Sequence, residues 1–219
     1  IKKPVFYKSI EGEERALVKV DGGVKLSYLA KFVARYGLAG IENLVGVPGS
    51  VGGSVAMNAG AEGAEISQVL RSIKFLTLNG EIKTYSKSEM IFAYRKTMFP
   101  SKDGIVIEAE LDLSIGKISE IYLKMDKYLS RRGLTQPLNM PNSGSIFKNP
   151  DGEKAGHLIE SAGLKGCQIG GAGVSIKHAN FIVNKGGALA EDIILLIKHI
   201  QTVVEEKSGI KLEQEIIVI

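Results

Sequence analysis

Apolar residues recur along the first part of the chain at spacings that predict strands and one helix. Residues 16–20, Ala-Leu-Val-Lys-Val, read as a strand, and Asp21-Gly22-Gly23 then turns the chain. From Lys25 to Tyr36 the apolar residues fall on one helical face, and Gly37 is a natural stop. Residues 105–113 give one or two further strands. The pattern therefore predicts a strand-rich opening to the fold.

A β-hairpin is predicted before the last of these strands. Two runs of residues with apolar alternation, 73–78 and 81–85, flank the dipeptide Asn79-Gly80. Asn-Gly between alternating runs is the strongest short-range hairpin signal, because both residues accept the positive φ of a tight turn. We expect the two runs to pair as antiparallel strands.

The second part of the chain is richer in helices, and the whole is predicted to be of the α+β class without sequence repeats. The loop 134–152 is expected to join the two parts, and clefts between domains are common ligand sites. The pattern predicts helices over 117–132, ending at Gly133, over 153–162, closed by Gly163, and over 191–206, with strands over 181–183 and 212–219. The apolar residues that share one face of the first of these helices are Ile118, Ile121, Tyr122, Met125 and Leu129.

Composition and charge narrow the class of protein only modestly. Of 219 residues, 44% are hydrophobic and 24% charged, which fits an ordinary globular protein. The formal net charge is +4 and no run of basic residues concentrates it. Because nucleic-acid binding requires a clustered basic face, we expect no nucleic-acid partner, whereas an anionic small molecule suits this charge.

Cysteine and histidine give no sign of a disulfide or a metal centre. Cys167 is the single cysteine, so an intramolecular disulfide is excluded, and it reads as a small packed residue. His157, His178 and His199 are scattered without metal-ligand spacing. No apolar run is long enough to cross a bilayer and no signal peptide is recognisable. We expect a cytoplasmic protein with no membrane partner and no metal.

A glycine-rich segment, residues 47–61, has the composition of an anion-binding loop. Glycines let backbone N–H groups approach a diphosphate closely. The segment is neither a Walker A loop nor a GxGxxG fingerprint, because it lacks the Gly-Lys-Ser/Thr and the glycine spacing. Glycines alone leave two interpretations equally open, an anion-binding loop and a turn that permits tight packing. Their density argues against a regular helix or strand at this place.

The loop at residues 141–150, Pro-Asn-Ser-Gly-Ser-Ile-Phe-Lys-Asn-Pro, is the strongest candidate for chemistry. It gathers hydroxyl, amide and amino groups between two prolines, a mixture that core packing does not explain. Loops held between rigid elements are where catalytic groups concentrate.

Five motifs, taken together and in order, resemble the UDP-N-acetylenolpyruvoylglucosamine reductase family, and the resemblance covers essentially all 219 residues. The residues that carry it are Pro48 to Gly53 with Met57 to Ala61, Tyr94-Arg95-Lys96-Thr97, Gly144 to Pro150, Gly171 to Asn184, and Leu212-Glu213-Gln214-Glu215. Thr97 stands where the family has serine, and Ile217 where it often has arginine.

The resemblance implies a flavin-dependent reductase of peptidoglycan precursor synthesis. NADPH would reduce a bound FAD, and hydride would then pass to the enolpyruvyl group of a UDP-sugar to give UDP-N-acetylmuramate. The implied fold is an FAD-binding domain of the vanillyl-alcohol-oxidase-like (PCMH-type) class followed by a smaller α+β substrate-binding domain. We expect a monomer whose partner is the UDP-sugar substrate.

The resemblance also implies domain boundaries. Residues 1–133 would be the second lobe of the FAD-binding region, and residues 134–208 the substrate-binding domain. Residues 209–219 would form a C-terminal strand that returns to the N-terminal lobe of the family enzymes. No segment of this sequence matches that lobe. The chain resembles the shorter subclass of the family.

Three catalytic residues follow from the resemblance. Arg95 would hold the carboxylate into which negative charge spreads, a task that suits a planar, permanently charged guanidinium. Ser145 would donate the proton to carbon. Glu215 would orient Arg95 or stabilise the enolic intermediate, although Glu213 would share its face in a regular strand.

Binding residues are implied in the same way, and His178 is interpreted as structural. The substrate would be bound by Tyr94, Lys148 and Asn149. The flavin would be bound by Pro48, Gly49, Ser50, Val51, Gly52, Gly53, Asn58 and Gly60.

Two other interpretations remain open. The glycine-rich segment also permits another PCMH-type flavin oxidoreductase, such as a hydroxy-acid oxidase, but Ser145 and Glu215 would then have no task. The family's N-terminal lobe has no match in this sequence, so the chain could instead be a non-catalytic remnant that binds a UDP-sugar, because a fold alone does not fix a function.

Overall fold

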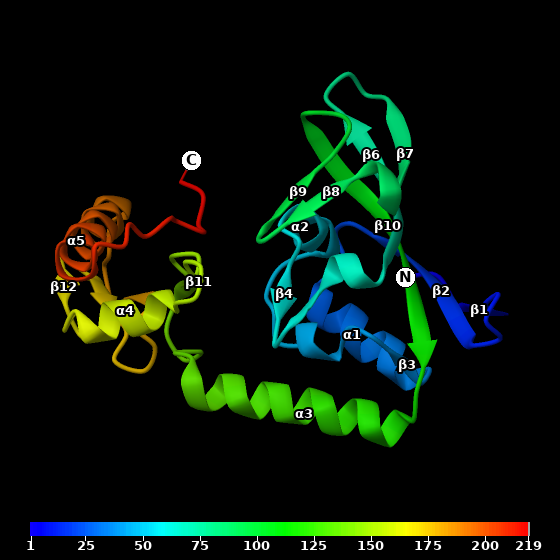
Figure 1. Ribbon diagram of the computed structural model, residues 1–219, viewed down its shortest axis with the longest axis horizontal. Helices are drawn as coiled ribbons and strands as arrows, with labels where there is room; N and C mark the ends of the chain where they lie inside the picture. The colour runs from blue at the N-terminus through cyan, green and yellow to red at the C-terminus, as the bar shows by residue number, and fades with distance from the viewer. Residues whose placement is uncertain (219) are drawn as a thin grey trace. The chain divides into compact units, whose positions relative to one another are not determined.

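The structure, a computed structural model, describes residues 1–218 and divides into two compact units (Figure 1). Unit 1 is Ile1–Ser130 and unit 2 is Arg131–Ile219. The boundary falls inside helix α3, Ile118–Thr135, so most of this helix belongs to unit 1. Within residues 1–218, none of the helices combines the length and the apolar character needed to cross a membrane.

Unit 1 is built on a six-stranded sheet in which the order β1-β2-β10-β6-β7 is entirely antiparallel and β3 pairs with the end of β10. The strands of this sheet are β1 Val5–Lys8, β2 Glu14–Asp21, β3 Leu38–Ala39, β6 Leu70–Thr77, β7 Ile82–Ser86 and β10 Gly104–Ile115. Its helices are α1 Leu26–Arg35, α2 Val51–Ala56 and most of α3, with 3-10 turns at Glu42–Leu44, Ile66–Gln68 and Lys87–Glu89. Two short hairpins complete it, β4 Gly60–Ala61 with β5 Ala64–Glu65, and β8 Ile91–Ala93 with β9 Lys96–Met98.

The two faces of this sheet differ because side chains alternate along each strand. One face is apolar and belongs to the core with α1 and α2; buried examples are Val18, Leu111 and Phe75. On the other face, ion pairs join neighbouring strands: Glu110 pairs with Lys19 at 3.2 Å and with Arg71 at 3.4 Å. An antiparallel sheet with one buried face therefore forms the centre of unit 1.

Several predictions for unit 1 are confirmed. The predicted first strand and helix are β2 and α1, and Gly37 ends the helix with a φ of +68°. The predicted hairpin is β6 with β7, in which Phe75 faces Lys83 across the pair. Residues 105–113 lie in the single strand β10. This strand pairs with β6 along its length, with a register shift between Val106 and Glu108.

The glycine-rich segment corrects one expectation, because part of it is a regular helix. Helix α2 contains Gly52 and Gly53, and its first residue is preceded by Ser50, whose Oγ accepts a hydrogen bond from the N–H of Gly53 at 3.2 Å. A serine at this position satisfies one of the open N–H groups of a helix start. Glycine is required at residue 52, because Gly52 faces the backbone of Val106 on β10 so closely that a side chain would not fit.

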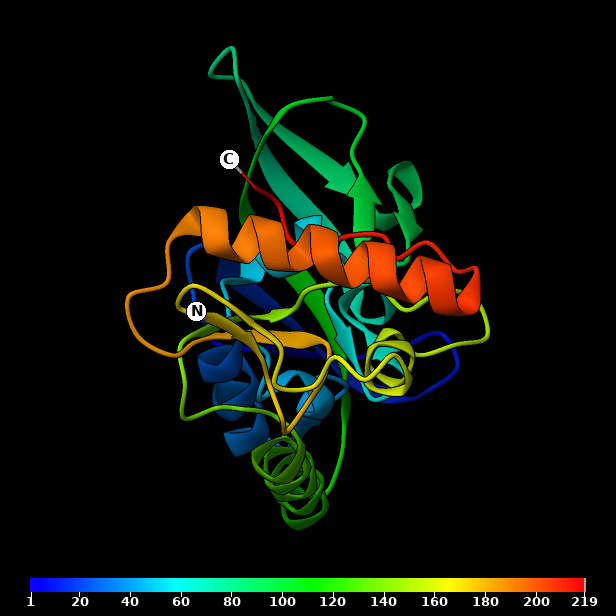
Figure 2. The same ribbon diagram turned by 90° about the vertical axis from the view of Figure 1, so that its left-hand side faces the viewer.

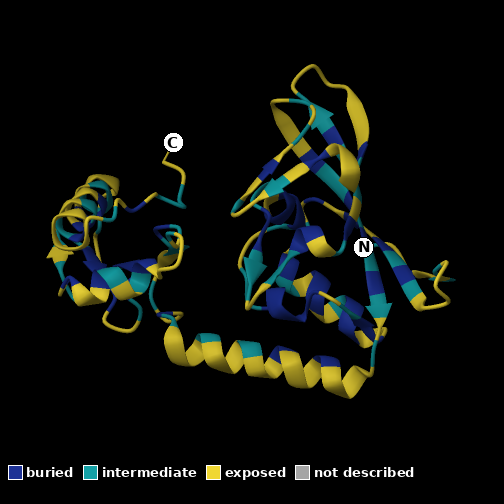
Figure 3. Ribbon diagram, in the orientation of Figure 1, coloured by how far each residue is buried: buried dark blue, intermediate teal, exposed yellow. Residues whose placement is uncertain are grey.

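Helix α3 also departs from the prediction. It passes through Gly133 and ends at Thr135, shortly before Pro137. Only Ile121 and Met125 of its predicted apolar face are buried, whereas Ile118, Tyr122 and Leu129 are exposed, as the largely yellow helix in Figure 3 shows.

Unit 2 is a four-stranded antiparallel sheet, in the order β11-β14-β13-β12, with helix α5 packed on it, as Figure 2 shows. Apolar residues of α5, among them Leu196, Ile197 and Ile200, join those of the sheet in the core. The elements are β11 Asn142–Ser145, α4 Ala155–Ser161, β12 Gln168–Ile169, β13 Ala172–Val174, β14 Phe181–Asn184 and α5 Ala190–Ser208. The predicted elements near 153–162, 181–183 and 191–206 are therefore confirmed.

The predicted strand at 212–219 is wrong for the residues that the structure describes. Between residues 212 and 218 the chain is irregular, and only Gln214 forms a β-bridge, with Phe147. Apolar content suggested a strand, but the stretch that this segment meets bends at Ile146, so a single bridge does not extend into a ladder. Residue 219 lies outside the described residues.

The close approach of α2 to β10 gives a test of stability. In Gly52→Ala the new methyl group would lie 2.7 Å from the carbonyl oxygen of Val106. Because that neighbour is backbone, we expect a loss of about 1–3 kcal/mol in the free energy of unfolding. In the control Gly53→Ala, the nearest atom is Ser50 Oγ at 3.4 Å, and stability should be kept or raised by up to about 1 kcal/mol. Urea unfolding of both variants without added cofactor measures this, and equal losses would contradict it.

Candidate functional site

The glycine-rich segment of unit 1 is tied to the turn that follows β2. The N–H of Leu26 donates to the carbonyl of Gly49 at 3.0 Å, and the N–H of Val51 donates to the carbonyl of Val24 at 2.8 Å. The N–H of Gly52 donates to the carbonyl of Gly22 at 2.8 Å. The glycines thus permit tight packing, which was one of the two interpretations of this segment.

The same segment keeps backbone donors free on its outer side. Among the described residues, the N–H groups of Gly49 and Ser50 have no acceptor, and Gly49 is exposed. Gly49 has a φ of +118°, and a Cβ built on it would meet nothing within 4 Å. Adjacent N–H groups without a protein acceptor are the arrangement that receives a phosphate oxygen. The segment therefore also fits the diphosphate of a flavin dinucleotide.

Arg95 lies in a strained turn next to this segment. It is the second residue of the two-residue connection between β8 and β9, and its φ is +56°. Its guanidinium carbon lies 4.7 Å from the centre of the Tyr94 ring. A Cβ on Gly60 would come within 3.3 Å of its Nη1, so the guanidinium lies against Gly60. Left-handed backbone is uncommon for a non-glycine residue and is typical of functional turns.

Two buried side chains fasten this hairpin to the glycine-rich segment. Asn58 donates from Nδ2 to the carbonyl of Ala93, immediately before the turn, at 3.1 Å, and to Glu65 Oε2 at 2.7 Å. Thr97 donates from Oγ1 to the carbonyl of Val55 at 2.6 Å. The side chain of Asn58 has no exposed surface, so its amide group binds protein atoms in this structure. In this structure the Asn58 side chain therefore holds the turn that carries Arg95.

In unit 2, the stretch 145–148 lies between two other segments of chain. On one edge Ser145 pairs with Phe181 of β14. On the other edge the N–H of Glu215 donates to the carbonyl of Ile146 at 2.8 Å, and the N–H of Lys148 donates to the carbonyl of Glu213 at 2.9 Å. The fold thus brings the Ser145 loop and the Glu215 segment together as neighbouring backbones, although they are far apart in sequence.

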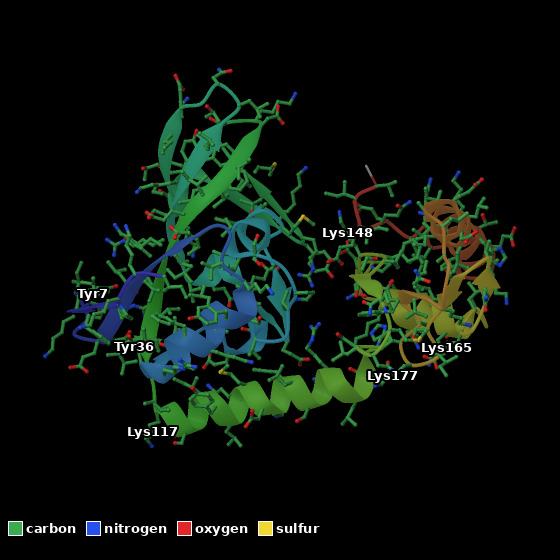
Figure 4. All side chains as sticks on the ribbon, turned by 180° about the vertical axis from the view of Figure 1, so that it is seen from behind. Tyr7, Tyr36, Lys117, Lys148, Lys165 and Lys177 are labelled. Atoms are coloured by element: carbon green, nitrogen blue, oxygen red, sulfur yellow. The ribbon has the colours of Figure 1, made fainter. Side chains whose placement is uncertain are left out.

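The two carboxylates of the C-terminal segment differ in environment. Glu213 is exposed and forms an ion pair with Lys148, which Figure 4 labels beside this segment. Glu215 is half-buried and hydrogen-bonded through its backbone to the Ser145 loop. The strand pattern alone left these two residues equivalent, and the resemblance to the family selected Glu215; in the structure their environments differ.

Asn149 and the residues after it begin helix α4. The Oδ1 of Asn149 accepts a hydrogen bond from the N–H of Ala155, the first residue of α4, at 3.1 Å. Asn149 is nonetheless exposed, which leaves its amide NH₂ accessible to a ligand.

Asn180 contacts the Ser145 loop, although the sequence did not mark it as a site residue. It is buried, and both polar atoms of its side chain bind the backbone of Phe147, at 3.0 Å and 2.8 Å. Its position between the matched residues His178 and Phe181 was the available signal, but sequence spacing does not show which chain a buried amide will bind.

His178 has a structural environment. Its ring meets the ring of Phe181 edge-on at 4.8 Å, and its Nδ1 accepts a hydrogen bond from the N–H of Asn180 at 3.3 Å. Burial, reinforced by the positive charge of Lys165, lowers the pKa of His178 below its ordinary value of 6.5, while Glu160 opposes the shift. These surroundings therefore favour the neutral form of the ring.

Comparison with known proteins places both units. Residues 7–86 match the family described as FAD binding domain, and residues 136–219 match UDP-N-acetylenolpyruvoylglucosamine reductase, C-terminal domain. A UDP-N-acetylenolpyruvoylglucosamine reductase of Halalkalibacterium halodurans is 43% identical over 98% of this chain and 70% of its own length. That of Listeria innocua is 45% identical over 98% of this chain and 72% of its own length.

A solved structure agrees with the sequence matches. The crystal structure of UDP-N-acetylenolpyruvylglucosamine reductase from Thermus caldophilus superposes with a TM-score of 0.81 at 38% identity, over 90% of this chain and 71% of that one. The fold is thus that of an α+β flavoprotein oxidoreductase whose cofactor is FAD. The chain belongs to the UDP-N-acetylenolpyruvoylglucosamine reductase family.

The depressed pKa of His178 gives a test of stability against pH. Its folded pKa lies below its unfolded value, so the unfolded state binds the extra proton. Stability is therefore fully present above about pH 6.5 and falls as the pH drops through the window below it, at most by about 1.4 kcal/mol per pH unit. His178→Gln should remove this component in urea unfolding between pH 7 and pH 5. His199→Gln, at an exposed site on α5, should keep it; identical pH profiles for both variants would contradict the assignment.

Proposed function

We propose that this chain carries the NADPH-dependent reduction of the enolpyruvyl group of UDP-N-acetylglucosamine-enolpyruvate to UDP-N-acetylmuramate, a step in peptidoglycan precursor synthesis. Family membership across 98% of the chain supports this reaction. The observation that supports it is the backbone pairing of the Ser145 loop with the Glu215 segment, which brings two of the proposed catalytic residues to neighbouring positions in the chain path. A hydroxy-acid oxidase would have no use for that pair.

Unit 1 is the proposed flavin-binding unit. FAD, when bound there and reduced by NADPH, would supply the hydride for the methylene carbon of the substrate. The free N–H groups of Gly49 and Ser50 would bind its diphosphate. Of the other residues expected here, Pro48 and Gly53 are exposed, whereas Val51 and Gly52 are buried. The buried pair would act by fixing the backbone.

Arg95 is the proposed partner of the substrate carboxylate. Hydride addition leaves negative charge on the carbon that bears the ether, and this charge spreads into the carboxylate as an enolate. A guanidinium placed in advance stabilises that charge without reorganisation of water. The left-handed turn, the Tyr94 ring and the close approach to Gly60 support this role, because each restricts the guanidinium.

Ser145 is the proposed proton donor that completes the reaction. Its hydroxyl gives a proton to the ether-bearing carbon, and solvent restores the hydroxyl proton afterwards. Glu215 would orient the donor region or the cationic partner of the enolate. A serine is a weak acid, so its position must supply much of the rate.

Unit 2 is the proposed substrate-binding unit. The amide of Asn149 and the ammonium group of Lys148 would bind the anionic part of the UDP-sugar, with Lys148 exchanging Glu213 for a phosphate. Tyr94 of unit 1 is exposed and is proposed to contact the same substrate. We further propose a monomer that acts in the cytoplasm, without membrane or nucleic-acid partners, in support of cell shape and division.

The overall reaction gives the first functional prediction. The purified full-length protein should show a flavin absorption spectrum and should oxidise NADPH only when the enolpyruvyl UDP-sugar is present. UDP-N-acetylglucosamine, which lacks the double bond, is the matched control and should support no oxidation. A colourless protein that cannot be reconstituted with FAD would disprove the proposal.

The proposed proton donor gives the second functional prediction. Ser145→Ala should slow reoxidation of the reduced flavin by substrate about 100-fold or more, the usual contribution of a general acid, and should spare flavin reduction by NADPH. Ser143→Ala changes an exposed hydroxyl on the same strand and should leave both half-reactions unchanged. Stopped-flow absorbance separates the half-reactions, and equal slowing of both by Ser145→Ala would exclude the proton-donor role.

A further inference from the structure

Asn180 binds the Ser145 loop through its backbone and its side chain. The N–H of Ile146 donates to its carbonyl at 2.9 Å. Its Oδ1 accepts from the N–H of Phe147 at 3.0 Å, and its Nδ2 donates to the carbonyl of Phe147 at 2.8 Å. The side chain is 4% exposed, so water does not compete for these bonds.

The side chain of Asn180 replaces a missing backbone pair. Ser145 pairs with Phe181, but the chain bends at Ile146, and the regular ladder stops there. An asparagine amide offers one acceptor and one donor in a plane, as a peptide group does. The peptide groups of Phe147 are thereby satisfied although the strand has ended. Leaving them buried and unpaired would be unfavourable.

The opposite edge of the same stretch carries the C-terminal segment. Phe147 forms a β-bridge with Gln214, and the carbonyl of Ile146 accepts the N–H of Glu215 at 2.8 Å. Because Phe147 and Ile146 are bound on both edges, a shift caused at Asn180 would move the attachment point of Glu215 as well as Ser145.

We propose that Asn180 is a positioning residue for the proton transfer, which fixes Ser145 and the Glu215 segment in one geometry. This inference rests on the proposed function, in which Ser145 donates the proton. Asn180 reaches the reaction only through the loop backbone and is not assigned a contact with the substrate. A displacement of about 1 Å at a reacting group can cost up to about 100-fold in rate, so its effect should fall on one half-reaction.

The test uses the full-length protein with FAD bound. Asn180→Ala removes both side-chain bonds to Phe147, and Asn180→Asp keeps the shape and the acceptor but loses the donor. Asn184 provides a matched control at the other end of β14, where its Oδ1 accepts from Gly186 at 2.8 Å and Ala188 at 3.3 Å. Asn184→Ala therefore removes a half-buried amide side chain whose hydrogen bonds go to Gly186 and Ala188 and not to the Ser145 loop.

Two measurements decide the proposal. In stopped flow, both Asn180 variants should slow reoxidation of the flavin by the enolpyruvyl UDP-sugar by about 10- to 100-fold and leave flavin reduction by NADPH unchanged. In hydrogen exchange, the amides of Ile146, Phe147 and Glu215 should lose protection. Asn184→Ala should change neither the rate of flavin reoxidation nor the exchange of these three amides.

The opposing outcomes are distinct. Equal slowing of both half-reactions, or loss of the folded state in both Asn180 variants, would overturn the proposal, because Asn180 would then support unit 2 as a whole. Faster exchange with a wild-type substrate half-reaction would also overturn it. If Ser145→Ala too leaves that half-reaction unchanged, the proposed function itself has failed, whereas a slow Ser145→Ala variant locates the failure in the role of Asn180 alone.

Discussion

The candidate chemistry of unit 2 depends on satisfying the backbone of residues 145–148. Buried peptide groups must be hydrogen-bonded, and this stretch finds partners on both edges. β14 and Asn180 provide one edge, and residues 213–215 provide the other. The irregular C-terminal segment is held by this requirement rather than by a strand of its own. The same bonds bring the backbones that carry Ser145 and Glu215 together.

In unit 1, hydrogen bonds from buried side chains hold the turn that carries Arg95. The antiparallel sheet buries one apolar face, and the glycine-rich segment packs against β10 where no side chain would fit. Asn58 and Thr97 then fasten the β8–β9 hairpin to that segment. The left-handed backbone of Arg95 persists because these bonds hold the turn from both sides.

In the proposed reaction the two units supply complementary groups. Unit 1 offers free N–H groups for an anionic cofactor and a cation for the developing enolate. Unit 2 offers a hydroxyl for the proton, a carboxylate, and an amide for the substrate. A buried amide side chain lies behind one member of each set: Asn58 binds the hairpin that carries Arg95, and Asn180 binds the loop that carries Ser145.

The sequence by itself determined the elements that local pattern dictates and the family. Helical spacing marked α1 and α5, and Asn79-Gly80 marked the β6–β7 hairpin, because such signals depend only on neighbouring residues. Five ordered motifs marked the family, which the comparisons confirm. Tertiary structure decided the rest. It made a helix of part of the glycine-rich segment and replaced the predicted last strand by a single bridge. It also gave Glu213 an exposed ion pair and Glu215 a half-buried position. These outcomes depend on which distant backbone a segment meets, and residue order does not state that partner.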